Sequence, residues 1–177
     1  MADFSIISDV SNEVLKLLRE NICPELIQSP ESIALAAPTD KNADFQLGLY
    51  LYDIQELREN QAQYPPKPLN LFFALYMNTK SQMMSNVENE QRILGRAMQV
   101  LMDHAILYET AENDETSASI TLLPMSYEEK TKIWSVLSIP YQLGIYFSVA
   151  PVLLSSRRIR SFKRVVAAEF DVSQRQR

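Results

Sequence analysis

The residues best suited to chemistry in this chain are one histidine and one cysteine. The 177-residue sequence holds a single histidine, His104, and a single cysteine, Cys23. A zinc site of the usual kind needs several such ligands, and no nucleophile turn of the Gly-x-Ser-x-Gly type accompanies the histidine. The spacing places His104 on the apolar face of a helix, which favours a buried or half-buried ring satisfied by a backbone group. Cys23 precedes Pro24 at a helix end, where a small buried thiol is favoured over a nucleophile.

Paired carboxylates are the remaining route to catalysis. Glu88 and Glu90 lie two residues apart, and Glu128 and Glu129 are adjacent. Side chains one or two positions apart on a helix point in different directions, so neither pair converges on a substrate. Stabilisation of a helix N-terminus is the favoured role for both. The three glycines form no phosphate-cradling loop. We therefore predict a protein that is not an enzyme and holds no cofactor or metal.

Charge is unevenly distributed along the chain. The net charge is −5, yet residues 157–177 hold seven basic and two acidic side chains, a net of +5. The remainder holds ten basic and twenty acidic side chains, a net of −10. A basic tail on an acidic body suits electrostatic docking, either onto an acidic partner or onto another copy of the protein. The alternative is that the tail is only solvated and makes no contact. The candidate partner-binding residues are Arg157, Arg158, Arg160, Lys163 and Arg164.

The stretch before this tail has the clearest strand pattern. Within Ile139–Arg158, apolar residues alternate with a second set, which predicts a strand. One face carries Leu143, Ile145, Phe147 and Val149, and the other Gln142, Gly144, Tyr146 and Ser148. Pro151 lacks a backbone donor, so the strand must end, bulge or run along a sheet edge there. An edge-type strand leading into a cationic tail indicates a docking element.

Two further long strands and three helices are predicted. Asp44–Leu57 places Phe45, Leu47, Leu49 and Leu51 on one face, with Tyr50 and Tyr52 on a partly covered second face. Leu69–Thr79 places Leu69, Leu71, Phe73, Leu75 and Met77 on one face. Helical spacing is found in Ser5–Asn21, in Ser85–Ala105 as the longest helix, and after Ser126, which with Glu129 forms a capping box. Short strands are expected at Glu31–Ala36 and in a hairpin of Ile106–Glu109 and Ser119–Leu123.

These elements predict a single α+β domain with a mostly antiparallel sheet packed with three helices. We expect the domain over residues 1–156 and a basic C-terminal extension over residues 157–177. The lone cysteine, and the absence of a basic start followed by an apolar run, favour assembly in the cytoplasm.

Several motifs together resemble one known family. The strand PYQLGIYFSVAPVLL resembles the C-terminal strand of cap, or tail-terminator, proteins from phage-tail-like contractile injection systems. The joint order of the motifs is more specific than any one of them. The other matching stretches are Ser5–Asn21, Ser29–Ile33, Asp44–Ile54 and Asn89–Leu101.

The resemblance implies a structural role. Proteins of this kind form a ring, here expected to be a hexamer, on the end of the inner tube and sheath of a particle, where they end polymerisation. The partners implied are other copies and the tube and sheath proteins. The alternative is a basic-tailed module that binds nucleic acid or acidic lipid, and the acidic body weighs against nucleic acid.

Overall fold

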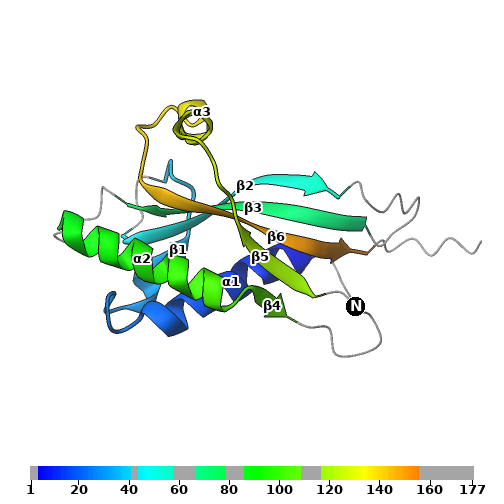
Figure 1. The fold of residues 1–177 in the computed structure, drawn as a ribbon, viewed down its shortest axis with the longest axis horizontal. Coiled ribbons are helices and arrows are strands. Elements are labelled where there is room, and N and C mark those ends of the chain that lie inside the picture. Colours follow the sequence, from blue (N-terminus) through cyan, green and yellow to red (C-terminus); the bar gives the residue numbers. More distant parts are fainter. Residues whose placement is uncertain (1–3, 41–43, 58–66, 79–85, 109–116, 156–177) are drawn as a thin grey trace, which may run out of the picture.

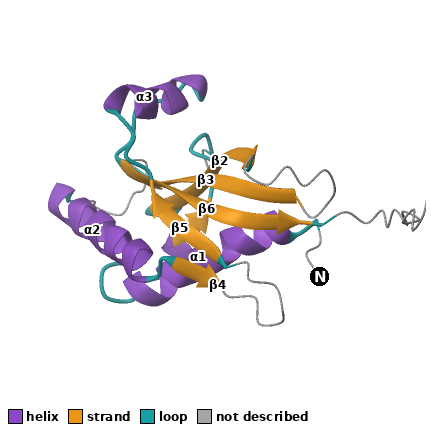
Figure 2. Ribbon diagram, turned by 45° about the vertical axis from the view of Figure 1, so that its right-hand side comes forward, coloured by secondary structure: helices purple, strands orange, loops and turns teal. Residues whose placement is uncertain are grey.

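The computed structural model describes residues 4–40, 44–57, 67–78, 86–108 and 117–155. These residues form one α+β domain in which a six-stranded sheet separates two layers of helix (Figures 1 and 2). The helices are α1 (Ile6–Ile22), α2 (Val87–Asp103) and α3 (Tyr127–Val136), with a 3-10 turn at Pro30–Ser32. The strands are β1 (Ile33–Leu35), β2 (Leu47–Glu56), β3 (Lys67–Met77), β4 (Ile106–Tyr108), β5 (Ala118–Leu122) and β6 (Gly144–Leu154).

The sheet has the order β1-β2-β3-β6-β5-β4. Only the β1–β2 pair is parallel among the described strands, and the other four pairs are antiparallel. The expected sheet class is therefore confirmed, with β6, the last of the described strands, near its centre.

The main core lies between the sheet and the α1–α2 layer. The alternation predicted for β3 is confirmed, since its five apolar residues from Leu69 to Met77 all lie in this core. Leu51 pairs with Phe73, and Phe73 pairs with Phe147, so the apolar rows of β2, β3 and β6 lie side by side. Helices α1 and α2 contribute Val14 and Leu101. Burial of this continuous surface is what selects the strand register.

Phe45 departs from the prediction that placed it with the apolar row of β2. It precedes the first residue of that strand, Leu47, so strand alternation does not apply to it. Its side chain is buried on the other side of the sheet with Tyr76 and Trp134. Tyr50 packs partly against this second cluster, which confirms that the tyrosine face of β2 is partly covered.

The edge position predicted for β6 is wrong. Pairing continues past Pro151, because Val152, Leu153 and Leu154 still pair with β3. Of the three outcomes expected at the proline, the structure shows the bulge: the register shifts between Leu69 and Leu71 of β3. A bulge accommodates the missing donor while both neighbouring strands remain in place.

The predicted helices are confirmed with small differences in length. Helices α1 and α2 each have 17 residues, so α2 is not the longest. Ser126 and Glu129 form the expected capping box at the start of α3. The predicted hairpin of β4 and β5 is present, while residues 109–116 between the two strands lie outside the described residues.

Candidate docking surfaces

The predicted docking residues lie outside the described part of the chain. Arg157, Arg158, Arg160, Lys163 and Arg164 all follow Ser155, the last residue described. What the structure adds is their point of attachment. The chain reaches them from β6, a strand with neighbours on both sides, so the cationic segment does not continue an edge strand. The surfaces that the described residues offer to partners are the two sheet edges, the hollow beside α1 and the outside of α3.

The edge formed by β1 is closed at Ile33 by a side chain of α1. Gln46 N–H donates to Ser32 O, and Ala36 N–H donates to Leu49 O, so alternate residues of β1 turn toward β2. The backbone groups of Ile33 therefore face outward. Arg19 donates to the Ile33 carbonyl from Nε at 3.0 Å and from Nη2 at 2.7 Å.

The amide of Ile33 is also occupied, by the Pro30 carbonyl. Both groups that an added strand would use at Ile33 thus have internal partners. The β1 edge is therefore a poor template for strand addition at Ile33.

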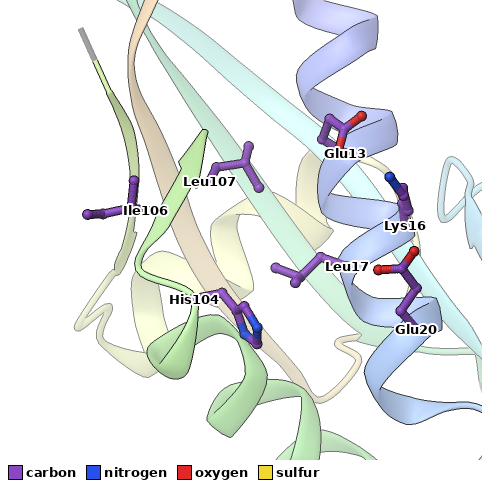
Figure 3. A pocket seen from close by; sticks show the side chains of 7 residues that line it. All are labelled: Glu13, Lys16, Leu17, Glu20, His104, Ile106 and Leu107. Atoms are coloured by element: carbon purple, nitrogen blue, oxygen red, sulfur yellow. The ribbon is translucent and has the colours of Figure 1, made fainter. Parts of the chain in front are cut away.

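The opposite edge, formed by β4, has no strand beyond it in the described chain. Beside it lies an open hollow between α1, the end of α2 and β4 (Figure 3). Leu17 and Leu107 form its apolar floor and are half-buried. Its rim carries Glu13, Lys16, Glu20, His104 and Ile106.

Exposed apolar side chains also lie on β4 and α2. Ile106 is 55% exposed, and on α2 the exposed fractions of Met98 and Met102 are 42% and 61%. Methionine side chains adapt to many partner shapes, so an exposed methionine pair on a helix is typical of a contact surface.

His104 is exposed, which corrects its predicted place on the buried face of the second helix. It is the residue at the C-terminal cap of α2, where the helix has already ended. Its Nδ1 lies 3.0 Å from the Val100 carbonyl oxygen, so the expected backbone partner is present. The hollow does bring this ring near Glu13 and Glu20. Its volume is about 110 Å³, below the roughly 300–1,000 Å³ of typical small-molecule sites. It fits a docking contact better than a substrate.

The other face of the sheet carries α3, which is attached mainly through one residue. Trp134 is 1% exposed and donates from Nε1 to Tyr146 Oη at 2.7 Å. Its ring meets Tyr76 edge to face at a centroid distance of 5.4 Å. Lys130 lies 5.5 Å above the Tyr146 ring. The outside of α3 remains open, with Val136 84% exposed.

The tyrosines beneath α3 are structural groups. Burial raises the pKa of Tyr52 to about 12, with a smaller contribution from the nearby Asp53 carboxylate. Burial also raises the pKa of Tyr76 and of Tyr146. These shifts reflect the burial of the three hydroxyl groups beneath α3.

Cys23 is a half-buried thiol packed against the main core. Burial raises the pKa of the Cys23 thiol, an effect partly offset by Arg19. A raised pKa lowers the thiolate fraction and with it the reactivity, which agrees with the predicted structural role. Among the described residues, no cluster of histidine, cysteine and carboxylate side chains could hold a metal ion. No described helix is long and apolar enough to cross a membrane.

The sequence did not point to the hollow or to the Arg19 contact. The hollow joins residues from positions 13–20 and 104–107, whose proximity depends on how α1 packs against β4. No local sequence pattern signals either feature.

Comparison with known proteins places the chain in a family. The family model described as the Pvc16 N-terminal domain matches residues 9–168. No curated protein matches by sequence.

Two solved structures share the fold. One is the PVC sheath/tube terminator in the extended state, from an extracellular contractile injection system. The match has a TM-score of 0.60 and 18% sequence identity, and it covers 95% of this chain and 65% of that chain. The other is the anti-feeding prophage cap, the AFP tube-terminating cap. The match has a TM-score of 0.56 and 17% sequence identity, and it covers 93% of this chain and 61% of that chain. The chain thus spans less than two thirds of the length of either. Since the family match covers most of the sequence, this chain belongs to the Pvc16 N-terminal domain family.

Proposed function

We propose that this protein is the cap of a contractile injection particle, which ends polymerisation of the inner tube and sheath and stabilises the finished end. The observation that carries the proposal is the shared fold, over 95% and 93% of this chain, with two proteins described as terminators. Family membership supports it independently of the fold comparison. Assembly takes place in the cytoplasm, before the particle is released or anchored.

The mechanism is steric. A layer of tube or sheath subunits offers surfaces to the next layer, and a cap occupies them without presenting an equivalent surface beyond. The contact of Arg19 with Ile33 supports this, because a strand whose outward carbonyl is occupied is a poor template for a further strand at that residue. The cap acts as a closed ring of six copies held by heterologous contacts.

The basic extension, residues 157–177, is the docking element in this proposal, attached to the domain of residues 1–156. Arginine suits the role because its planar guanidinium grips carboxylates through two hydrogen bonds. Single charge pairs at an interface rim contribute only about 0.2–1 kcal/mol. Several basic residues must therefore act together.

Electron microscopy of particles assembled with and without the protein tests the proposal. We expect particles of uniform length with the protein and tubes and sheaths of irregular length without it. The combined substitutions Arg157→Glu, Arg158→Glu and Arg160→Glu should leave a folded protein that no longer caps. Uniform particles in the complete absence of the protein would overturn the capping function. Salt-dependent binding of duplex DNA by a monomer would instead favour the nucleic-acid alternative.

A further inference from the structure

We propose that the hollow between α1 and β4 is the receptor for the basic extension of a neighbouring copy, and that this contact closes the ring. The inference builds on the proposed docking role of the extension and names the surface that it contacts. The occupant is the segment of residues 158–166, bound as an added strand along β4 with Phe162 in the hollow.

The first argument is the sheet edge. An incoming strand needs unpaired backbone groups, and the sheet has two edges in the described chain, β1 and β4. Arg19 and Pro30 occupy the outward groups of Ile33 on β1. Beside β4 there is open space flanked by α1 (Figure 3). An extended segment therefore fits at β4 and is excluded at Ile33.

The second argument is the spacing of charges. Glu13 and Glu20 are seven residues apart on α1 with Leu17 between them, which places the two carboxylates about 10 Å apart along one face. In an extended segment, alternate residues lie on the same face, and their Cα atoms are about 6.8 Å apart. Arg160, Phe162 and Arg164 share such a face. If Phe162 lies opposite Leu17, one of the two arginines is within reach of Glu13 and the other is within reach of Glu20.

The third argument is the shape of the hollow. Its floor is apolar, formed by Leu17 and Leu107, and its volume is about 110 Å³. That is roughly the space of a single aromatic ring. Lys16 lies on the rim between the two glutamates. Its cation disfavours an arginine at the middle position and tolerates a phenylalanine, which agrees with the order Arg160, Phe162, Arg164.

The length of the extension allows contact between copies. Twenty-two residues follow Ser155, and a chain of that length spans up to about 70 Å when extended. The hollow and the extension are different surfaces of one subunit. Pairing different surfaces gives a heterologous contact, the kind that generates closed rings.

Crosslinking between two differently tagged copies of the full chain tests the proposal, with Cys23→Ala in both. One copy carries His104→Cys at the rim of the hollow, and the other carries Ser161→Cys in the extension. We expect a bismaleimide to join the two copies. In the matched control, Val136→Cys replaces His104→Cys, which moves the thiol to the exposed outside of α3. Equal yields at the two positions would overturn the assignment.

Two sets of variants test the details of the contact. Phe162→Ala should lower the crosslink yield several-fold, while Ile159→Ala, on the opposite face of the segment, should leave it unchanged. Glu13→Arg with Glu20→Arg should lower the yield, and Arg160→Glu with Arg164→Glu in the partner copy should restore it. Reversal of Glu88 and Glu128, which are exposed on α2 and α3, is the charge-matched control. If reversal of Glu88 and Glu128 lowered the crosslink yield as much as reversal of Glu13 and Glu20, the proposed contact would be contradicted.

The remaining outcomes are also decisive. A crosslink that forms only within one chain, in a copy that carries both cysteines, would overturn the contact between neighbours. So would the absence of an inter-copy product both in the purified protein and in protein recovered from particles. The measurement on purified protein needs no tube or sheath. A failed crosslink with normal capping would therefore refute the receptor alone, and a specific crosslink with no capping would refute only the proposed function.

Discussion

Trp134 donates a hydrogen bond from its indole Nε1 to Tyr146 Oη at 2.7 Å, and this contact connects α3 to the centre of the sheet. Tyr146 lies on β6, the strand that leads to the basic extension. The helix that covers the second face and the segment proposed to dock are therefore linked through a single buried pair. A helix of ten residues is marginal by itself, so α3 depends on this attachment.

Replacing Trp134 with phenylalanine should lower the free energy of unfolding by about 1–2 kcal/mol, because the Tyr146 hydroxyl loses its buried partner. Urea unfolding followed by circular dichroism measures the change, since Trp134 is the sole tryptophan and its fluorescence is lost. Val136→Ala on the same helix is the control, with an expected change within about 0.5 kcal/mol. Equal effects of the two substitutions would show that the indole hydrogen bond does not hold α3.

Phe73 is a test of the main core. It is fully buried and stacks on Phe147 at a centroid distance of 5.3 Å. Phe73→Ala should lower the free energy of unfolding by about 3–5 kcal/mol, as large truncations in cores do. Phe4→Ala is the matched control, because the Phe4 side chain is 75% exposed. A loss below about 0.5 kcal/mol at Phe73 would contradict its core position.

Gly48 and Gly95 should respond to alanine with opposite signs. A Cβ at Gly48 would lie 2.5 Å from Cζ of Tyr76, whose ring is held against Trp134 and Phe45. The ring must shift, so Gly48→Ala should destabilise the protein by about 1–3 kcal/mol. Gly95 lies within α2 with nothing within 4 Å of the added carbon. Gly95→Ala should stabilise by about 0.5–1 kcal/mol. Thermal unfolding of both variants measures the two changes in stability. If both substitutions stabilised the protein, or both destabilised it, the contrast between the two glycines would be refuted.

Tyr52 should make the protein sensitive to alkali. Burial raises its folded-state pKa to about 12, against an ordinary value of about 10. The unfolded chain thus releases this proton at lower pH than the folded protein does. The stability that Tyr52 contributes is fully present below about pH 10 and is lost as the pH rises toward about 12. Tyr52→Phe should make the urea midpoint fall less steeply over that interval. An unchanged slope would show that Tyr52 ionises equally in both states.

The sequence predicted the parts of the fold that depend on alternation. The β3 row from Leu69 to Met77 and the cap formed by Ser126 and Glu129 were readable because each depends on residues close in sequence. Phe45 was misplaced because alternation was extended beyond the first residue of the strand. Pro151 was misread as an edge signal because a bulge in a central strand depends on both neighbouring strands.

The candidate site was less predictable than the fold. His104 was assigned to a buried face because the helical pattern was continued by one position past Asp103, where α2 ends. The hollow depends on the packing of α1 against β4, and no local pattern encodes that distance. The basic extension was visible as composition, but composition carries no information about the surface that receives it.

The two bulges that flank β3 divide this part of the sheet into regions that can exchange with solvent separately. Strand β3 has a bulged neighbour on each side: the register with β2 shifts between Leu51 and Asp53, and the register with β6 shifts at Asn70. The Asn70 side-chain oxygen is buried without a hydrogen-bond partner among the described residues. Interrupted ladders uncouple the segments on either side of them. The amides of Lys67, Leu69 and Val152–Leu154 should therefore lose hydrogen-exchange protection before those of Phe73 and Phe147. The end of the sheet from which the basic extension departs can then open and close while the core beneath it remains folded.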